Sequence, residues 1–278
     1  MSTTGLPLIH TRFAPPRGTE DVVEHTWVLR SSTGLDRPVR SLVVPNARGA
    51  VAVALGDGAV SIDPLSGERG PASGVIGLRR VPVVLEHVGS VHHVGLRLRP
   101  YAFHGSAAVA RLVDRVLPLE TVLAAQALRA DLRDVPDGAA ADEERATVLA
   151  RAVAAALPCT VPPDRRRIID DALVAAEQAD GLIRQLDVAR RTGVNPSLLR
   201  TVLDEFTGVG GPELLAIVRL HHFLGSGTGP DQGAQARRAL ATYPVHAHPA
   251  REVLRFTGME PEVFVRVRDG LLGLLDER

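Results

Sequence analysis

The sequence predicts an α+β protein in which a β-rich N-terminal domain precedes an all-helical C-terminal domain. Between about Val39 and Pro100, short apolar runs alternate with Gly, Pro, Asp and Asn at the spacing of strands and turns. Beyond Pro163 the apolar residues recur at helical spacing. The proline-containing stretch over residues 157–167 suits an extended linker. We therefore expect an N-terminal domain at 1–162 and a C-terminal domain at 163–278.

Composition limits the classes of protein to consider. The chain has 278 residues, 45% of them apolar, which is enough for two buried cores. Basic and acidic residues number 32 each, so net charge favours no partner. The single cysteine, Cys159, excludes an intrachain disulfide framework and any multi-thiolate metal site. The N-terminus lacks a secretory signal and no apolar run has membrane-spanning length, so we expect a cytoplasmic protein with no membrane partner.

The N-terminal domain is expected to end in helices. Residues 95–100 alternate apolar and basic side chains, as a half-buried strand does. From Ala107 the spacing becomes helical, with Leu112 and Val116 on one face. Residues 135–144 are small and acidic, which predicts an exposed loop, and a helix is expected from about Arg145 to Ala156.

Residues 182–220 carry the pattern of a helix-turn-helix. Leu186 and Ala189 share one face of a short helix, and Gly193 permits the left-handed backbone of a tight turn. Asn195 is a favoured N-cap, followed by Pro196 at the first helical position. The predicted second helix, Pro196–Thr207, buries Leu198, Leu199, Val202 and Phe206 and turns Ser197, Arg200, Thr201 and Asp204 outward.

The segment 186–220 resembles the first helix-turn-helix and connecting helix of AraC-family regulators. The matching residues are Ala189, Gly193, Val194, Leu199, Gly208, Pro212, Arg219 and Leu220. Residues 238–268, with FTGMEP near the end, are similar to the second helix-turn-helix of that family. The resemblance places the two units at about 182–208 and 231–258.

Upstream segments resemble an N-terminal domain often fused to AraC-type modules. They are His25–Arg30, Val43–Asn46, Gly95–Phe103 and Leu112–Glu120. The resemblance implies a bacterial, sequence-specific transcription regulator that binds double-stranded DNA and needs no cofactor. It also implies an N-terminal domain that binds a small-molecule effector or forms a homodimer.

The resemblance also implies which residues contact DNA. Ser197, Arg200 and Thr201 are expected at base edges, where arginine binds guanine in bidentate fashion. Arg190, Arg191 and Arg219 are candidate phosphate contacts, although Arg219 is equally compatible with a structural role. The second unit contributes Arg251 and Arg255, with His246 and His248 near DNA or engaged in capping and packing.

Other features leave a second interpretation open. Asp204 and Glu205 follow the candidate base-reading residues, and from Arg165 to Arg278 arginines and carboxylates are equally numerous. A degenerate family member that binds a small molecule or a protein partner, with weak or no DNA binding, is therefore the alternative function.

Catalytic and metal-binding roles find little support in the sequence. No catalytic motif of the common enzyme classes occurs, so no enzyme is expected. The histidines His87, His92, His93 and His104 suggest a metal site only weakly, because adjacent His92 and His93 face opposite sides of a strand. No metal is expected, and Trp27 lines either the core or an effector pocket.

Overall fold

The structure is a computed structural model that describes residues 8–31, 33–43, 45–63, 66–104, 112–137, 140–225 and 249–261. The chain divides into two compact units. One comprises Met1–Ser41, Arg48–Leu78 and Val83–Thr160, and the other comprises Leu42–Ala47, Arg79–Pro82 and Val161–Arg278. We call them the β unit and the helical unit.

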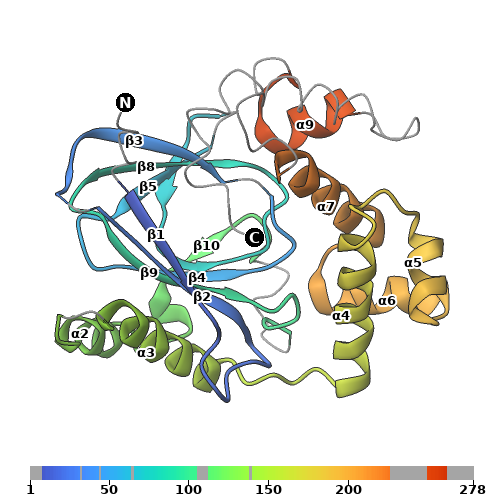
Figure 1. Ribbon diagram of the computed structural model, residues 1–278, viewed down its shortest axis with the longest axis horizontal. Coiled ribbons are helices and arrows are strands. Elements are labelled where there is room, and N and C mark those ends of the chain that lie inside the picture. Colours follow the sequence, from blue (N-terminus) through green and yellow to red (C-terminus); the bar gives the residue numbers. More distant parts are fainter. Residues whose placement is uncertain are drawn as a thin grey trace. The chain divides into compact units, whose positions relative to one another are not determined.

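The β unit contains two antiparallel sheets (Figure 1). The six-stranded sheet has the order β1 (Leu8–Phe13), β2 (Val23–Ser31), β9 (His92–Leu98), β4 (Ala50–Ala54), β7 (Gly74–Ile76) and β10 (Val116–Leu117). The four-stranded sheet has the order β3 (Leu35–Val43), β8 (Val83–Gly89), β5 (Ala59–Ile62) and β6 (Arg69–Pro71). Antiparallel sheets combined with helices confirm the expected mixed α and β composition.

Helices cover one face of the six-stranded sheet (Figure 1). After the 3-10 turn η1 (Leu119–Thr121), helix α2 (Ala125–Asp134) packs on helix α3 (Ala141–Ala156), and α3 packs over β2 and β9. The fully buried core residues at this contact include Val28, Val94, Leu96, Leu132 and Leu149. We call this side of the sheet the helix-covered face.

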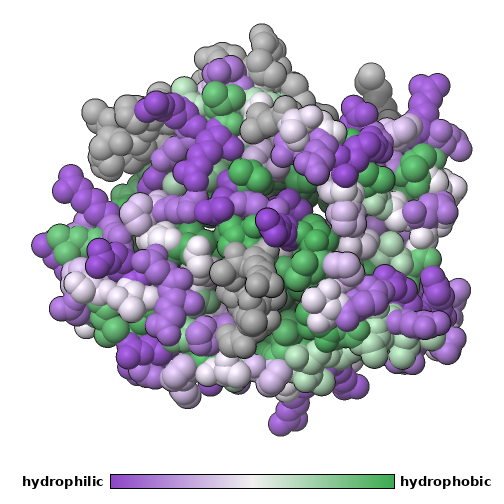
Figure 2. Space-filling model, turned by 180° about the vertical axis from the view of Figure 1, so that it is seen from behind, coloured by the Kyte–Doolittle hydropathy of each residue, from purple (hydrophilic) through white to green (hydrophobic). Residues whose placement is uncertain are grey.

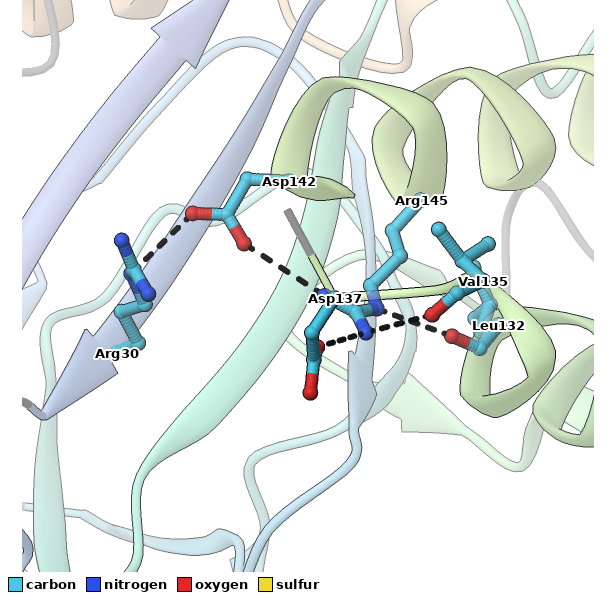
Figure 3. A network of polar contacts seen from close by, with 6 residues as sticks. All are labelled: Arg30, Leu132, Val135, Asp137, Asp142 and Arg145. Atoms are coloured by element: carbon cyan, nitrogen blue, oxygen red, sulfur yellow. Dashed lines mark hydrogen bonds and ion pairs between the residues drawn. The ribbon is translucent and has the colours of Figure 1, made fainter. Parts of the chain in front are cut away.

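Arg145 joins these two helices (Figure 3). Its guanidinium donates to the carbonyl oxygens of Leu132 and Val135, which lie at the C-terminal end of α2, over 3.1 and 3.0 Å. It also pairs with Asp137 at 2.8 Å and lies 3.9 Å from Asp142, whose other oxygen meets Arg30 of β2. Because the last carbonyls of a helix lack intrahelical donors, Arg145 acts as a C-terminal cap of α2.

The opposite face of the six-stranded sheet is turned toward the four-stranded sheet. The rings of His93 in β9 and His87 in β8 meet edge to face with centroids 5.6 Å apart. Since side chains alternate along a strand, the neighbouring His92 lies on the helix-covered face. We call the side that carries His93 the inner face.

Several local expectations were wrong. Strands also occur before the predicted stretch, from Leu8 onward, because β1 pairs with β2 and β2 pairs with β9. Val116 lies in the short strand β10, which pairs with β7, and not in a helix. Helix α3 begins at Ala141, so the predicted loop over residues 135–144 is shorter than expected.

The helical unit contains helices α4 (Pro163–Glu177), α5 (Gln185–Thr192), α6 (Pro196–Thr207), α7 (Gly211–Gly225) and α9 (Pro249–Thr257). Helix α4 packs on α5, α6 and α7, and α9 packs on α7. Residues 42–47 and 79–82 also belong here, although they connect strands of the β unit. Asn46 and Arg79 form a β-bridge, and His221 Nε2 donates to the carbonyl oxygen of Pro45 over 2.9 Å. The sequence did not indicate this grouping.

Candidate nucleic-acid interface

Local sequence explains the turn between α5 and α6. Gly193 ends α5 with φ 66°, in the left-handed region that a residue without Cβ adopts most easily. Asn195 caps α6, with its side-chain oxygen accepting from the backbone N–H of Ser197 over 2.8 Å. Pro196 then supplies a fixed φ at the first helical position. These residues hold α6 at a defined angle to α5.

The buried face of α6 differs in part from the prediction. Leu199, Val202 and Phe206 are buried as expected, whereas Leu198 is 37% exposed and Leu203 is only 1% exposed. In α5 the buried residues are Val188 and Ala189, and Leu186 is 46% exposed. The expectation for Leu198 was wrong, because packing against α4 and α7 selects which apolar residues of α6 are covered.

The residues predicted to read bases lie on the exposed side of α6. Ser197, Arg200 and Thr201 are all exposed, and Arg200 has no side-chain hydrogen bond or ion pair within the described residues. Asp204 and Glu205 are exposed on the same helix, one turn further on. The N-terminal half of α6 therefore presents polar donors to solvent, and its C-terminal half presents two carboxylates.

The two arginines predicted to contact phosphates from α5 differ in their contacts. Arg190 pairs with Asp187 at 2.9 Å, although 70% of its side chain remains exposed. Arg191 is exposed, and its side chain forms no hydrogen bond or ion pair with the described residues. Arg191 is therefore available for a phosphate, and Arg190 would have to share its charge with Asp187.

Arg219 of α7 occupies a structural position. Its guanidinium donates to the carbonyl oxygen of Gly181 over 2.8 Å and pairs with Glu252 of α9 at 2.9 Å. Gly181 must lack a Cβ here, because that atom would lie 2.5 Å from the carbonyl oxygen of Leu215. Arg219 thus ties the connection between α4 and α5 to α9, which favours the structural role that the sequence left open.

Replacing Arg219 by Met is expected to lower the free energy of unfolding by about 2–3 kcal/mol, because Glu252 and the Gly181 carbonyl lose a charged partner. Urea unfolding followed by helical circular dichroism measures the change. Arg190→Met is the matched control, with an expected change below about 0.5 kcal/mol because its ion pair is exposed. Equal effects of the two substitutions would contradict the structural assignment.

The ends of α6 and α9 have the same local structure. Thr207 Oγ1 donates to the carbonyl oxygen of Leu203 over 2.7 Å, and Thr257 Oγ1 donates to that of Val253 over the same distance. In each case the hydroxyl also accepts from the backbone N–H two residues later, over 3.2 Å. A left-handed glycine follows each threonine, at φ 70° and 71°. The repeated Phe-Thr-Gly sequence thus produces the same helix ending twice.

Helix α9 is docked on α7 by a second ion pair. Arg255 pairs with Glu213 and lies over the ring of Phe256, 5.2 Å from its centroid. Arg251 is exposed and has no partner among the described residues. Of the two arginines predicted in this helix, Arg251 is therefore the one available to another molecule. The predictions for His246 and His248 lie outside the described residues.

Sequence reasoning missed the acidic residues that hold α9. Glu213 and Glu252 each pair with an arginine that was predicted to contact DNA. Their positions in the first turns of α7 and α9 gave no signal of these partners, because acidic residues are common at helix N-termini for electrostatic reasons alone.

Three further observations concern the surface, membrane spans and metal ligands. On the face shown in Figure 2, hydrophilic side chains form most of the outline, with hydrophobic ones visible between them. None of the described helices is long and apolar enough to cross a membrane. Within the described residues, no group of three or more His, Cys, Asp or Glu side chains is placed to hold a metal ion.

Comparisons with known proteins give only distant similarities. No family model and no curated protein matches the chain. Among solved structures, the chain is similar to a lysine-to-alanine variant of apo ToxT from Vibrio cholerae strain SCE256. The TM-score is 0.44 at 10% identity, covering 94% of this chain and 98% of that chain. ToxT from Vibrio cholerae O395 gives 0.43 at 9% identity, covering 85% and 97%. Similarity at this level assigns the chain to no family.

Proposed function

We propose that the chain is a sequence-specific DNA-binding transcription regulator of the AraC type. The observation that carries the proposal is the exposed N-terminal half of α6, where Ser197, Arg200 and Thr201 face solvent on a helix capped at both ends. A helix presented in this way by a preceding helix and a tight turn has the geometry that enters a major groove.

The internal repeat supports a second contact with DNA. Helices α6 and α9 end in the same Phe-Thr-Gly structure, so position 251 corresponds to position 201. Arg251 then takes the exposed place that Thr201 has in the first unit. We propose that the two helix-turn-helix segments, which contain α6 and α9, occupy successive major grooves. We also propose that the β unit binds a small-molecule effector or pairs with a second copy of the chain.

Selection of bound sequences from a randomised duplex pool, at two salt concentrations, tests the proposal directly. Two enriched boxes about one helical turn, or roughly 10 base pairs, apart are expected if both units bind. One box would implicate only the unit of α6. The selection is repeated with small molecules extracted from cells, so that an effector-bound state of the protein is also sampled. Absence of enrichment in both selections would overturn the proposal.

Replacing Arg200 by Ala is expected to weaken binding to the selected site by about 1–3 kcal/mol relative to random duplex, because a bidentate contact to guanine is lost. Competition binding with both duplexes measures the ratio. Arg191→Ala is the matched control. It should weaken both complexes alike and reduce the salt slope by about one, as a phosphate contact does. An equal loss on both duplexes for Arg200→Ala would remove its base-reading role.

A second candidate function is an interaction module with little DNA binding. The exposed carboxylates of Asp204 and Glu205 favour it, because they would approach phosphates on the proposed recognition helix. The two functions differ in affinity. A salt-dependent dissociation constant of about 10 nM or lower for a selected site would exclude the second. If the chain is a DNA-binding regulator, Asp204→Asn is expected to strengthen its nonspecific binding to duplex DNA. If the chain is an interaction module, no such change is expected.

A further inference from the structure

Four exposed residues of α6 form one row on the side of the helix that faces away from its buried residues. They are Ser197, Arg200, Thr201 and Asp204, at positions i, i+3, i+4 and i+7. Residues at this spacing lie on the same face of a helix. The recognition helix of a homeodomain reads bases with four residues at the same spacing. Asp204 therefore belongs to the row that contains the three residues proposed above to read bases.

The Asp204 carboxylate is available to another molecule. Within the described residues it forms no hydrogen bond or ion pair, although Arg200 lies one turn before it on the same helix. A Cβ at Gly210 would lie 3.4 Å from Asp204 Oδ1, so the glycine leaves the carboxylate uncrowded. By contrast, Glu213 and Glu252 of the neighbouring helices each pair with an arginine. An ionised carboxylate only accepts hydrogen bonds, so Asp204 adds an acceptor to a row of donors.

An acceptor on a base-reading row favours one base in particular. In the major groove, the N4 amino group of cytosine donates to carboxylates. Adenine also presents an amino group there, but the N7 acceptor beside it repels a carboxylate. Positions 200 and 204 are separated by about 6 Å along the helix axis, and successive base pairs by about 3.4 Å. The two side chains therefore reach base pairs that are one or two steps apart.

The corresponding position of α9 holds an apolar residue. The repeated Phe-Thr-Gly sequence relates the two helices by 50 positions, so Leu254 corresponds to Asp204. Leu254 is 40% exposed, whereas Val253 and Phe256 of the same helix are fully buried. It follows the exposed Arg251 by three positions, so the two lie on one face. Apolar side chains at base edges contact the C5 methyl group of thymine.

We propose that positions 204 and 254 determine which base pairs the two recognition helices select. Asp204 accepts a hydrogen bond from N4 of a cytosine, one or two base pairs from the guanine that Arg200 binds. Leu254 contacts the methyl group of a thymine in the second box. The inference rests on the DNA-binding function proposed above and deepens it, because two boxes of different sequence make an asymmetric site that the protein binds in one orientation.

Selection from the randomised duplex pool with full-length wild type and with Asp204→Asn tests the first helix. Asparagine binds N6 and N7 of adenine, so one C·G pair of the first box is expected to become A·T in the variant. Duplexes that differ only at this base pair then give the affinities. Wild type should prefer C·G, and the variant A·T, by about fivefold or more.

Glu205→Gln is the matched control. It removes the same charge one position later, outside the row, from another exposed residue of α6. It is expected to strengthen binding to all duplexes alike, because a repulsion with phosphates is removed, and to leave the selected sequence unchanged. A difference between the two variants therefore separates base reading from net charge.

Leu254→Asp tests the second helix by giving it the residue of the first. One T·A pair of the second box is expected to become C·G, while the first box stays as in wild type. Because Leu254 is exposed and the ion pair of Arg255 with Glu213 is kept, the substitution should leave α9 docked on α7. Helical circular dichroism of each variant checks that the fold is unchanged.

Three outcomes would overturn the inference while wild type still selects a sequence. They are the same first box for wild type and Asp204→Asn, a change of that box in Glu205→Gln, and a second box that is absent or unchanged in Leu254→Asp. No enriched sequence with wild type would overturn the DNA-binding function itself, and the inference with it. The wild-type selection alone therefore distinguishes the two kinds of failure.

Discussion

Replacing Arg145 by Met is expected to lower the free energy of unfolding of the β unit by about 3 kcal/mol. The side chain is only 8% exposed, and its guanidinium is the donor to two carbonyl oxygens at the end of α2 (Figure 3). Methionine keeps much of the apolar stem but donates nothing. The carbonyls of Leu132 and Val135 would then be left without this donor, and Asp142 would keep only Arg30.

Urea unfolding followed by Trp27 fluorescence measures this effect, because the tryptophan reports on the β unit alone. Asp137→Asn is the matched control. Its carboxylate accepts from the same guanidinium, but 96% of the Asp137 side chain is exposed, so the pair should add little stability. If both variants unfold at the same urea concentration, the capping role of Arg145 is wrong.

Acid is expected to destabilise the β unit through its buried histidines. Burial is the largest cause that lowers the pKa of His25 to about 3 and of His93 to about 4, from 6.5. Burial also lowers the pKa of His87. The unfolded chain therefore binds protons below pH 6.5 that the folded chain does not bind. The stabilisation by each neutral histidine is complete above pH 6.5 and declines as the pH falls toward the folded value.

The expected slope is up to about 1.4 kcal/mol per pH unit for His25 and for His93 between pH 6.5 and 4. Unfolding free energies at half-unit steps of pH, with Trp27 fluorescence as the signal, give this slope. His93→Gln should reduce it by about one proton while retaining a polar side chain. The same slope in wild type and variant would show that His93 is protonated equally in both states.

The helical part of the fold was the more predictable from sequence. Gly193, Asn195 and Pro196 fixed the end of α5 and the start of α6, because each acts on its own backbone or on that of near neighbours. Strand β9 followed from the alternation of Leu96, Arg97 and Leu98. Strand β2 could not be predicted in this way, since its polar residues His25 and Thr26 are buried only once it pairs with β9, a strand distant in sequence.

The candidate DNA-binding residues were predictable as a set but not in their contacts. Ser197, Arg200 and Thr201 were placed outward from helical periodicity, and they are exposed. Arg219 and Arg255 were also predicted to contact DNA, with a structural role left open for Arg219. Each is paired with a glutamate on another helix, which no local pattern specifies.

The sequence by itself determined the turn and caps around α6 and the repeated Phe-Thr-Gly helix ends, because backbone preferences and capping depend on residues a few positions apart. Only the tertiary structure decided that Leu203 is buried and Leu198 exposed, that Arg219 joins Glu252, and that residues 42–47 group with the helical unit. It also decided that His25 and Arg97, 72 positions apart, lie opposite each other in the paired strands β2 and β9. Burial and charge pairing depend on which distant segments pack together, and that is a property of the whole fold.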